Sequence, residues 1–375
     1  MKKTLNYSLL AIILTGVTIL CCVRWKVWFG NPPEPVWTED TIPFRFHTFA
    51  DDSIPRFTIT DNTFINTNSP DTLRFIVLGD VHNGIDSVLW EKMWQRHSGI
   101  DFYAQLGDFI DRGYFYYYEL LVKEIHNTHF ADLPVIVTPG NHEYRKGFVK
   151  CLPPIWIGEW WRNPLNGPER YKGRTFYVDF PNLRFIAIDT NGLQKLSDYT
   201  VVLTWLNMAL DSAEDKFKLV IMHHPVYSGA YGRVNIGEYA AFRRALQKAD
   251  VVFSGHDHNY YRRLPFVGTT STAKHKLSKV NSKHDRIGSG RQMYELCTII
   301  SDTLNIQTYL MKEGLLYDEF NVICTTDSNN IKTHQYFVSE PCLEEIVDIP
   351  DKYKNKTNSI KIKIFNKRLK QRKQK

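Results

Sequence analysis

Short apolar runs alternate with longer amphipathic stretches through the middle of the chain. Apolar runs rich in β-branched and aromatic residues are typical of buried strands, whereas the longer stretches between them have helical periodicity. This alternation favours βαβ units and a mainly parallel sheet. The expected strands cover residues 73–78, 102–106, 135–138, 217–222 and 251–254, and the expected helices cover residues 87–97, 114–126, 202–210 and 236–249.

The pattern changes toward the end of this region. Alternating runs at 294–300, 304–310 and 316–322 follow one another closely, which is typical of antiparallel strands. A further hairpin is expected between 175–180 and 183–190, and the polar segment 269–291, rich in Ser, Lys and Gly, is expected to be a mobile loop. Antiparallel strands around a βαβ region favour an α/β fold in which two sheets pack face to face with helices outside, an α/β/β/α sandwich.

The N-terminal segment is predicted to contact a membrane. Lys2 and Lys3 precede an uncharged run from Leu9 to Val23, and apolar residues continue to Phe29. This length fits an uncleaved signal anchor or a cleaved signal peptide, and the missing A-x-A site favours the anchor. The rest of the chain is therefore expected outside the cytoplasm, in the periplasm or extracellular space, anchored to the membrane or secreted after cleavage. Lipidation of a cysteine is a weaker alternative.

Composition divides the chain into an N-terminal segment (1–30), a linker or extension (31–70), a globular domain (71–345) and a basic tail expected to be disordered (346–375). The net charge is +7, but the last 25 residues alone contribute +10, so the remainder carries −3. This distribution argues against a nucleic-acid partner. The cysteines form no CxxC pair, which leaves free thiols or one disulfide, such as Cys324 with Cys342.

Strand ends in this chain carry residues that can bind a metal. The motifs are GDVH (79–82), GDFIDRG (107–113), GNHE (140–143), MHHP (222–225) and GHDH (255–258). A single His or Asp after a strand is most often a packing or capping residue, but repeated use of the same residue types is hard to explain in that way. Ligands of open α/β sheets bind at the carboxyl ends of the strands. We therefore expect these side chains to meet at one site.

The donor types indicate a pair of divalent ions. Carboxylate, imidazole and amide donors suit borderline ions such as Mn, Fe or Zn, whose identity the sequence leaves open. The donors are too many for one tetrahedral site, whereas two ions bridged by a carboxylate would use them all. Such a pair binds a phosphate group and converts a bridging water to hydroxide, which attacks phosphorus in line.

The order of the motifs resembles that of the calcineurin-like metallophosphoesterase superfamily over residues 73–260. The resemblance implies the two-sheet α/β/β/α sandwich, a phosphate-ester substrate and a dinuclear metal centre. It implies that the first metal is held by Asp80, His82 and His258, and that Asp108 bridges the two metals. The second metal would be held by Asn141, His223 and His256.

The resemblance also implies roles outside metal coordination. His142 would contact the phosphate and act as a general acid or stabilise charge. Asp111 would orient His142, and Arg112 would bind phosphate oxygens, as in the phosphoprotein phosphatases of the superfamily. A surface salt bridge is the alternative for Arg112, and His224 is expected to be a spectator.

The later part of the chain looks more like the purple acid phosphatase branch, especially in GHDHNYYRR (255–263). That branch has a metal-binding Tyr three residues after the bridging Asp, and this chain has Asp111 there. We therefore expect no ferric–tyrosinate absorption. The favoured activity is hydrolysis of a phosphomonoester, with a phosphodiesterase acting on nucleotides or lipids as the alternative. A non-catalytic binding module of the same fold is less favoured, because no ligand position is lost.

Overall fold

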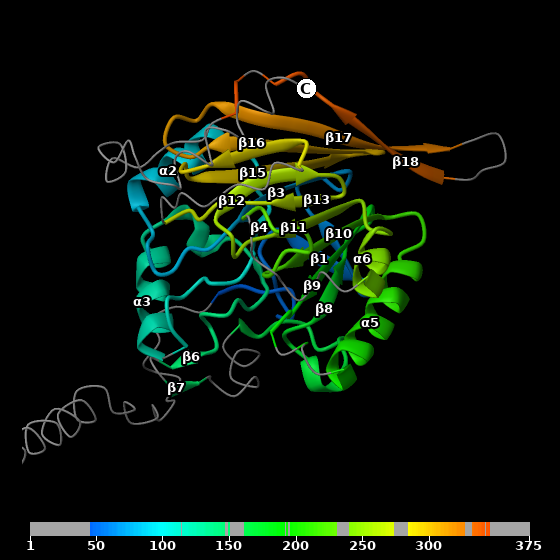
Figure 1. The fold of residues 1–375 in the computed structure, drawn as a ribbon, viewed down its shortest axis with the longest axis horizontal. Helices are drawn as coiled ribbons and strands as arrows, with labels where there is room; N and C mark the ends of the chain where they lie inside the picture. The colour runs from blue at the N-terminus through cyan, green and yellow to red at the C-terminus, as the bar shows by residue number, and fades with distance from the viewer. Residues whose placement is uncertain are drawn as a thin grey trace, which may run out of the picture.

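The computed structural model describes residues 46–113, 115–146, 149–150, 161–191, 193, 196–230, 240–273, 284–326, 332–341 and 343–345. Within these ranges two large sheets pack face to face and helices lie against their outer sides (Figure 1). The expected membrane segment and basic tail lie outside the described residues. None of the helices described is both long and apolar enough to span a membrane.

The first sheet has seven strands in the order β18-β17-β16-β15-β3-β4-β5. Its β3, β4 and β5 run parallel, and the other strands continue the sheet antiparallel from β3. The strands are β3 (Thr72–Leu78), β4 (Phe102–Gln105), β5 (Val135–Val137), β15 (Met293–Ile300), β16 (Thr303–Leu310), β17 (Leu316–Thr326) and β18 (Lys332–Val338). Helices α2 (Ser87–Arg96) and α3 (Phe115–His126) and the 3-10 turn η2 (His129–Asp132) accompany its parallel part.

The second sheet has nine strands in the order β1-β2-β8-β9-β10-β11-β13-β12-β14. Its β9, β10, β11 and β13 run parallel. The strands are β1 (Phe57–Thr60), β2 (Thr63–Asn66), β8 (Phe176–Asp179), β9 (Leu183–Ile188), β10 (Phe217–Met222), β11 (Val251–Ser254), β12 (Asn259–Arg263), β13 (Phe266–Gly268) and β14 (Arg286–Ser289). The remaining elements are helices α5 (Leu196–Asp211) and α6 (Ala240–Leu246), the turn η3 (Glu169–Tyr171) and the small ladder of β6 (Arg145–Lys146) with β7 (Val149–Lys150).

Alternate residues of the central strands enter different apolar layers. Phe75 and Val77 of β3 lie in the core between the two sheets, and Ile76 and Leu78 lie in the layer under α2 and α3. A strand buried on both faces has a continuous apolar sequence, which is why β3 has no polar alternation at its end. The two faces together fix the direction of the strand and place its carboxyl end at one edge of the sandwich.

The structure confirms the two-sheet arrangement and most of the expected elements. The strands expected at 217–222 and 251–254 have these bounds, and the expected hairpin forms between β8 and β9. The helix expected at 202–210 begins earlier, at Leu196. Its additional first turn has a polar sequence, so the apolar pattern alone did not reveal it.

The expectation of a mobile loop at 269–291 is wrong for the residues that the structure describes. Thr269, Thr270, Ser271 and Thr272 are buried, and β14 pairs with β12. Three of these side chains are compatible with burial because their hydroxyl groups form hydrogen bonds. The hydroxyl of Thr270 accepts from the main-chain N–H of Met293 at 2.7 Å, that of Ser271 donates to the carbonyl of Asp80 at 2.6 Å, and that of Thr272 donates to the carbonyl of Gly79 at 3.1 Å. Polarity therefore marked internal hydrogen bonding in this segment rather than exposure.

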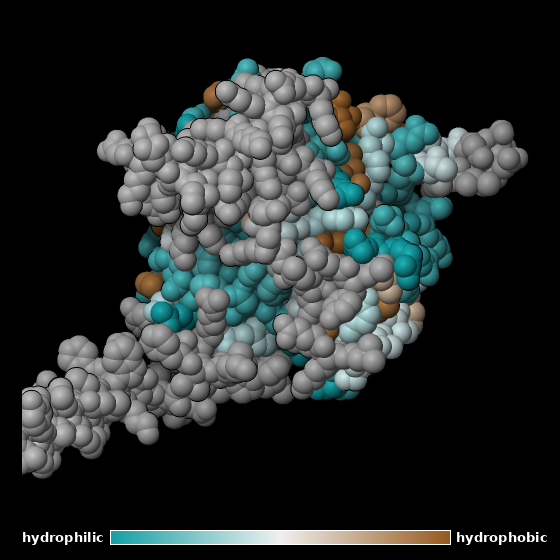
Figure 2. Space-filling model, viewed as in Figure 1, coloured by the Kyte–Doolittle hydropathy of each residue, from teal (hydrophilic) through white to brown (hydrophobic). Residues whose placement is uncertain are grey.

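The expected linker at 31–70 includes residues that join the domain. From Phe46 onward the chain packs on the sandwich, and β2 pairs with β8 in the second sheet. Phe49 lies in the core between the sheets, with its ring centroid 5.4 Å from that of Phe102. Residues 31–45 lie outside the described part of the chain. The described surface on the face in Figure 2 is mainly hydrophilic, with small separate apolar patches.

Candidate functional site

The predicted ligands lie at the carboxyl ends of parallel strands from both sheets. Asp80 and His82 follow β3, Asp108 follows β4, and Asn141 and His142 follow β5. From the second sheet, His223 follows β10, and His256 and His258 follow β11. Face-to-face packing of the two sheets brings these strand ends to a common edge, where the side chains lie close together.

The first group consists of Asp80, His82 and His258, which are all buried. Nε2 of His258 lies 3.3 Å from Oδ1 of Asp80 and 3.4 Å from Nε2 of His82. One donor atom from each residue lies within 4.8 Å of the others. Two imidazoles and a carboxylate at this spacing fit the donor set of a divalent transition ion.

Asp108 lies between the two groups of donors. Its Oδ2 is 3.8 Å from Nε2 of His82 in the first group and 3.4 Å from Nε2 of His223 in the second. Its Oδ1 accepts a hydrogen bond from the main-chain N–H of His142 at 2.7 Å. One carboxylate oxygen is therefore held by the protein, and the other faces both donor groups.

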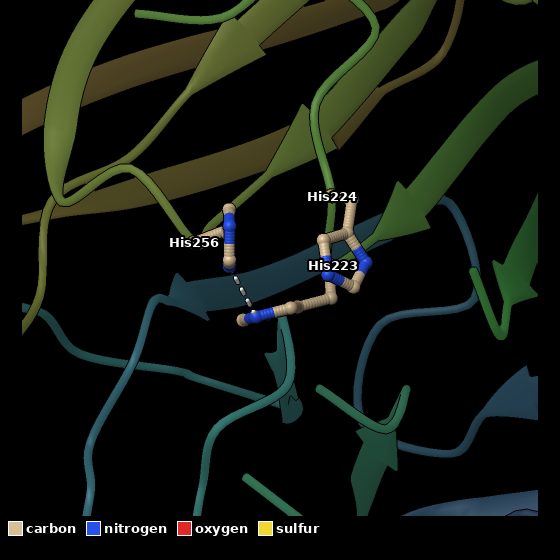
Figure 3. Close-up of side chains that lie close together, drawn as sticks. All are labelled: His223, His224 and His256. Atoms are coloured by element: carbon tan, nitrogen blue, oxygen red, sulfur yellow. Dashed lines mark hydrogen bonds between the residues drawn. The ribbon is translucent and has the colours of Figure 1, made fainter. Parts of the chain in front are cut away.

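The second group includes His223, His256 and Asn141. Nε2 of His223 lies 3.2 Å from Oδ1 of Asn141. It also lies 3.2 Å from Nδ1 of His256, the contact drawn in Figure 3. Nδ1 of His223 lies 2.9 Å from the carbonyl oxygen of Leu106 and, when it carries the ring proton, donates a hydrogen bond to that oxygen. A metal-binding histidine usually has its second ring nitrogen fixed in this way, which directs the other nitrogen to the ion.

The backbone at these positions is strained. Asp80, His82, Asp108, His256 and His258 all have positive φ angles, between 29° and 66°. Such a conformation costs about 1–3 kcal/mol for a residue other than glycine, and it persists only where the surrounding structure imposes it. The concentration of strain at the predicted ligands is typical of a functional site.

Close backbone approach explains the glycines of the GDFIDRG and GNHE motifs. Gly107 has φ +85°, and a Cβ atom there would lie 2.5 Å from the main-chain nitrogen of Gly140. A Cβ atom at Gly140 would lie 2.3 Å from Oδ1 of Asp108. Only residues without a side chain therefore allow the two loops to bring Asp108 and Asn141 together.

The charges of the site stabilise one another. Burial alone would raise the pKa of Asp80, but the neighbouring His258 lowers it to about 2. Burial likewise opposes ionisation of Asp108, and His223 nevertheless holds the pKa of Asp108 well below its usual value. Burial would lower the pKa of His223, which Asp108 instead raises to about 10. The carboxylates are ionised, and a metal that binds His223 must displace a proton.

Glu143 joins the two loops that carry Asp108 and Asn141. Its buried carboxylate accepts hydrogen bonds from the main-chain N–H groups of Asp108, Phe109, Ile110 and Gly140 at 2.7–3.1 Å. Burial and the charge of Asp108 raise the pKa of Glu143 to about 7. The GNHE motif places Glu143 beside His142, where it was expected to line the pocket or to pack, and its residue type gave no sign of these main-chain contacts.

Asp111 and Arg112, which were expected to act outside metal coordination, make different contacts. Nδ1 of His142 donates to the main-chain carbonyl of Asp111 at 2.6 Å, whereas Oδ1 of Asp111 is 3.6 Å away. The carbonyl rather than the carboxylate therefore makes the direct contact with His142. The Arg112 side chain is 43% exposed, and its Nε lies 4.0 Å from Oδ2 of Asp111.

His224, which was expected to be a spectator, lies beside the second group of donors, and one of its ring nitrogens lies within 4.8 Å of donor atoms of His223 and His256. Its ring centroid is 4.5 Å from that of His256 and 4.9 Å from that of His223, and Figure 3 shows the three rings beside one another. Its Nδ1 is 2.7 Å from the hydroxyl oxygen of Thr190, just after β9. The end of β9 thus contributes to the site, although it carries none of the five motifs.

Comparison with known proteins agrees with this arrangement. The calcineurin-like phosphoesterase family matches the chain over residues 73–260, and no curated protein matches it. The chain belongs to the calcineurin-like phosphoesterase family. It has His and Asp clusters that can hold a metal.

The chain is also similar in fold to solved structures. A purple acid phosphatase, PPD1 from yellow lupin seeds, matches with a TM-score of 0.51 and 15% identity, over 67% of this chain and 53% of its own. GAP50, described as the anchor in the inner membrane complex of Plasmodium, matches with a TM-score of 0.46 and 16% identity, over 75% and 98%. PhoD matches with a TM-score of 0.48 and 11% identity, over 80% and 77%. This chain thus spans about half the length of the lupin protein.

Proposed function

We propose that this protein is a phosphatase that hydrolyses phosphomonoesters with a pair of divalent metal ions. The observation that supports the proposal most directly is the position of Oδ2 of Asp108 between two donor groups, 3.8 Å from His82 and 3.4 Å from His223. A carboxylate oxygen shared in this way is what a bridged pair of ions requires.

The residues present fit such a pair. In the proposal Asp80, His82 and His258 hold the first ion, Asp108 bridges, and Asn141, His223 and His256 hold the second. The donor set, which combines carboxylates, imidazoles and one amide oxygen, suits Mn, Fe or Zn. When bound, the ions supply a Lewis-acid site for phosphate oxygens and an activated hydroxide for in-line attack.

His142 is the proposed general acid or charge-stabilising residue. Its Nδ1 is hydrogen-bonded to the carbonyl of Asp111, so its Nε2 is directed toward the centre, 3.8 Å from Oδ2 of Asp108. A positioned imidazole contributes about 10²–10⁴-fold to such reactions. Arg112, at the exposed rim, is proposed to bind phosphate oxygens through its planar guanidinium group.

The metal donors serve either ester class, so the substrate must be established by assay. The alternative is a phosphodiesterase acting on nucleotide or lipid substrates. The protein should be compared on p-nitrophenyl phosphate and bis-p-nitrophenyl phosphate after loading with Mn, Fe or Zn. The proposal requires higher kcat/KM for the monoester and loss of that activity in His142→Ala. A preference for the diester would support the alternative, and no hydrolysis of either ester with any of the metals would contradict both.

We also propose, from the sequence, that residues 1–30 hold the enzyme at a membrane with its catalytic domain outside the cytoplasm. The uncharged run from Leu9 to Val23 supports this proposal. Fractionation of the full chain and of a chain lacking residues 1–30 tests it. Recovery of both chains in the same soluble fraction would contradict it.

A further inference from the structure

Two polar segments outside the five motifs lie beside different halves of the metal centre. Asp189, Thr190 and Asn191 follow β9, and Ser271 and Thr272 follow β13. We propose that each segment positions the ligands that belong to one metal, apart from the shared Asp108: residues 189–191 those of the second metal, and residues 271–272 those of the first. This inference rests on the two-metal centre of the proposed function.

The segment at 189–191 holds both ends of the loop that carries Asn141. The side-chain amide of Asn191 donates to the carbonyl of Pro139 at 3.0 Å, just before the loop. After the loop, the hydroxyl of Tyr144 donates to Oδ2 of Asp189. Asn141 and His142 lie between these two attachments, so the segment limits how far this loop can move.

A buried ion pair fixes Asp189 itself. Nη1 of Arg174 donates to Oδ2 of Asp189 and also to the hydroxyl of Tyr144, the latter at 2.7 Å. The other carboxylate oxygen of Asp189 accepts from the main-chain and side-chain N–H groups of Asn191 at 2.8 and 3.0 Å. The Asp189 side chain is fully buried, and so each of these bonds lies in a medium where an unmade bond is costly.

The same segment also contacts His224, which follows β10 and lies beside the proposed second metal position. The hydroxyl oxygen of Thr190 lies 2.7 Å from Nδ1 of His224 and accepts from its main-chain N–H at 3.2 Å. The His224 ring lies against the rings of His223 and His256 (Figure 3). Thr190 therefore fixes a ring that packs on two of the proposed ligands of the second metal.

The first metal position has a different support. The hydroxyl of Ser271 donates to the carbonyl of Asp80 at 2.6 Å, and the hydroxyl of Thr272 donates to the carbonyl of Gly79 at 3.1 Å. In the described part of the chain, no hydrogen bond of Asp189, Thr190 or Asn191 reaches Asp80, His82 or His258. The two segments therefore contact different ligands directly, while the main-chain N–H of His256 donates to the Asp80 carboxylate at 3.0 Å and connects the two halves of the centre.

Separate supports predict that variants of the two segments affect different metals. Each site is measured alone: His258→Ala leaves the second site, and His256→Ala leaves the first. Mn²⁺ or Zn²⁺ is titrated into each metal-free protein against a chromophoric chelator. Substitution of a residue that holds a metal ligand in place weakens metal binding by about 10–100-fold. In the His258→Ala protein, Asn191→Ala and Thr190→Val should raise the Kd by about this factor, and Ser271→Ala should change it less than about threefold.

In the His256→Ala protein the pattern should reverse, with Ser271→Ala weakening binding and Asn191→Ala leaving it nearly unchanged. Tyr144→Phe keeps the ring and loses only the hydroxyl, so it should act like Asn191→Ala. Tyr317→Phe removes another buried hydroxyl, which donates to the carbonyl of Ile287, and should change neither Kd. Thermal unfolding of every variant separates a loss of folding from a loss of affinity.

Equal weakening by Asn191→Ala and by Ser271→Ala in both single-site proteins would overturn the inference while leaving the two-metal centre intact. The same holds if neither substitution changes either Kd. If the unmodified chain binds only one ion, the proposed function fails first, and the inference fails with it. The two failures are therefore distinguishable in one set of titrations.

Discussion

The main-chain N–H of His142 donates a hydrogen bond to Oδ1 of Asp108 at 2.7 Å. This bond connects the loop after β5 to the loop after β4, and it leaves Oδ2 of Asp108 facing the histidines of both donor groups. The proposed general acid and the proposed bridging ligand therefore share one fixed geometry. A change at Asp108 should affect both metals at once.

Asp108→Asn should abolish binding of both ions and lower kcat/KM by about 10²-fold or more, because an amide nitrogen cannot replace the shared oxygen as a ligand. The substitution keeps an oxygen that can accept from His142, so the fold should persist. Metal content per chain and hydrolysis of p-nitrophenyl phosphate measure the effect. Asp101→Asn, at another buried carboxylate that accepts from the main-chain N–H of Arg74, is the control. Retention of two ions by Asp108→Asn would contradict the bridging role.

His142→Ala should retain both metals and lower kcat by about 10²–10⁴-fold, because it removes a proton donor rather than a ligand. Asp111→Ala should have a much smaller effect, under about tenfold, because the carbonyl of Asp111 holds His142 and the substitution leaves it in place. Steady-state kinetics with measured metal content distinguish the two variants. A loss of activity in Asp111→Ala as large as that in His142→Ala would show that the carboxylate is required.

Arg112→Ala should raise KM and lower kcat/KM by about 10-fold, since a charge-assisted contact to the phosphate is lost. Arg112→Lys should restore only part of this loss, because lysine cannot form the planar two-point contact. The exposed Arg162, which pairs with Asp51 at 2.9 Å, provides the control substitution to alanine. Unchanged kinetics in Arg112→Ala would assign this side chain to a surface salt bridge.

Glu295 should make the stability of the protein depend on pH. It lies between the sheets, where burial raises its pKa from 4.5 to about 8. Between these two values the folded chain keeps a proton that the unfolded chain has released. The stabilisation is therefore complete below pH 4.5 and is lost as the pH rises toward 8.

Glu295→Gln removes this titration. Between pH 5 and pH 8 the free energy of unfolding of the unmodified chain should fall more steeply than that of the variant. The two slopes should differ by about 1.4 kcal/mol per pH unit. Urea unfolding at several pH values measures the difference. Parallel pH profiles for the two proteins would show that Glu295 has an ordinary pKa in the folded state.

The sequence predicted the central strands well because their burial on both faces imposes a continuous apolar pattern. It predicted the polar segment at 269–291 poorly, because Ser271 and Thr272 are buried through hydrogen bonds to carbonyls at 79–80, which are distant in sequence. The spacing of apolar and polar residues along the chain carries no information about hydrogen-bond partners that are distant in sequence. The same limitation concealed β14, whose Arg286 is buried with its guanidinium over the ring of Tyr317.

For the site, the motifs located every proposed ligand, and the structure brings them together. The motifs did not reveal what holds these ligands. Glu143 acts through main-chain N–H groups of two loops, and Asp189 acts through Arg174 and Tyr144, so neither role is visible from residue type. Asp111 contacts His142 through its main-chain carbonyl, a group that is present at every residue and has no sequence signal.

The most direct test of the account is the number of metal ions bound per chain at equilibrium. The metal-free protein should bind two Mn²⁺ or Zn²⁺ ions, and His256→Ala and His258→Ala should each bind one. His97→Gln, at a buried histidine whose Nε2 is 2.7 Å from the hydroxyl of Tyr294, should still bind two. A single ion in the unmodified protein, or loss of both ions in each single variant, would contradict the dinuclear centre.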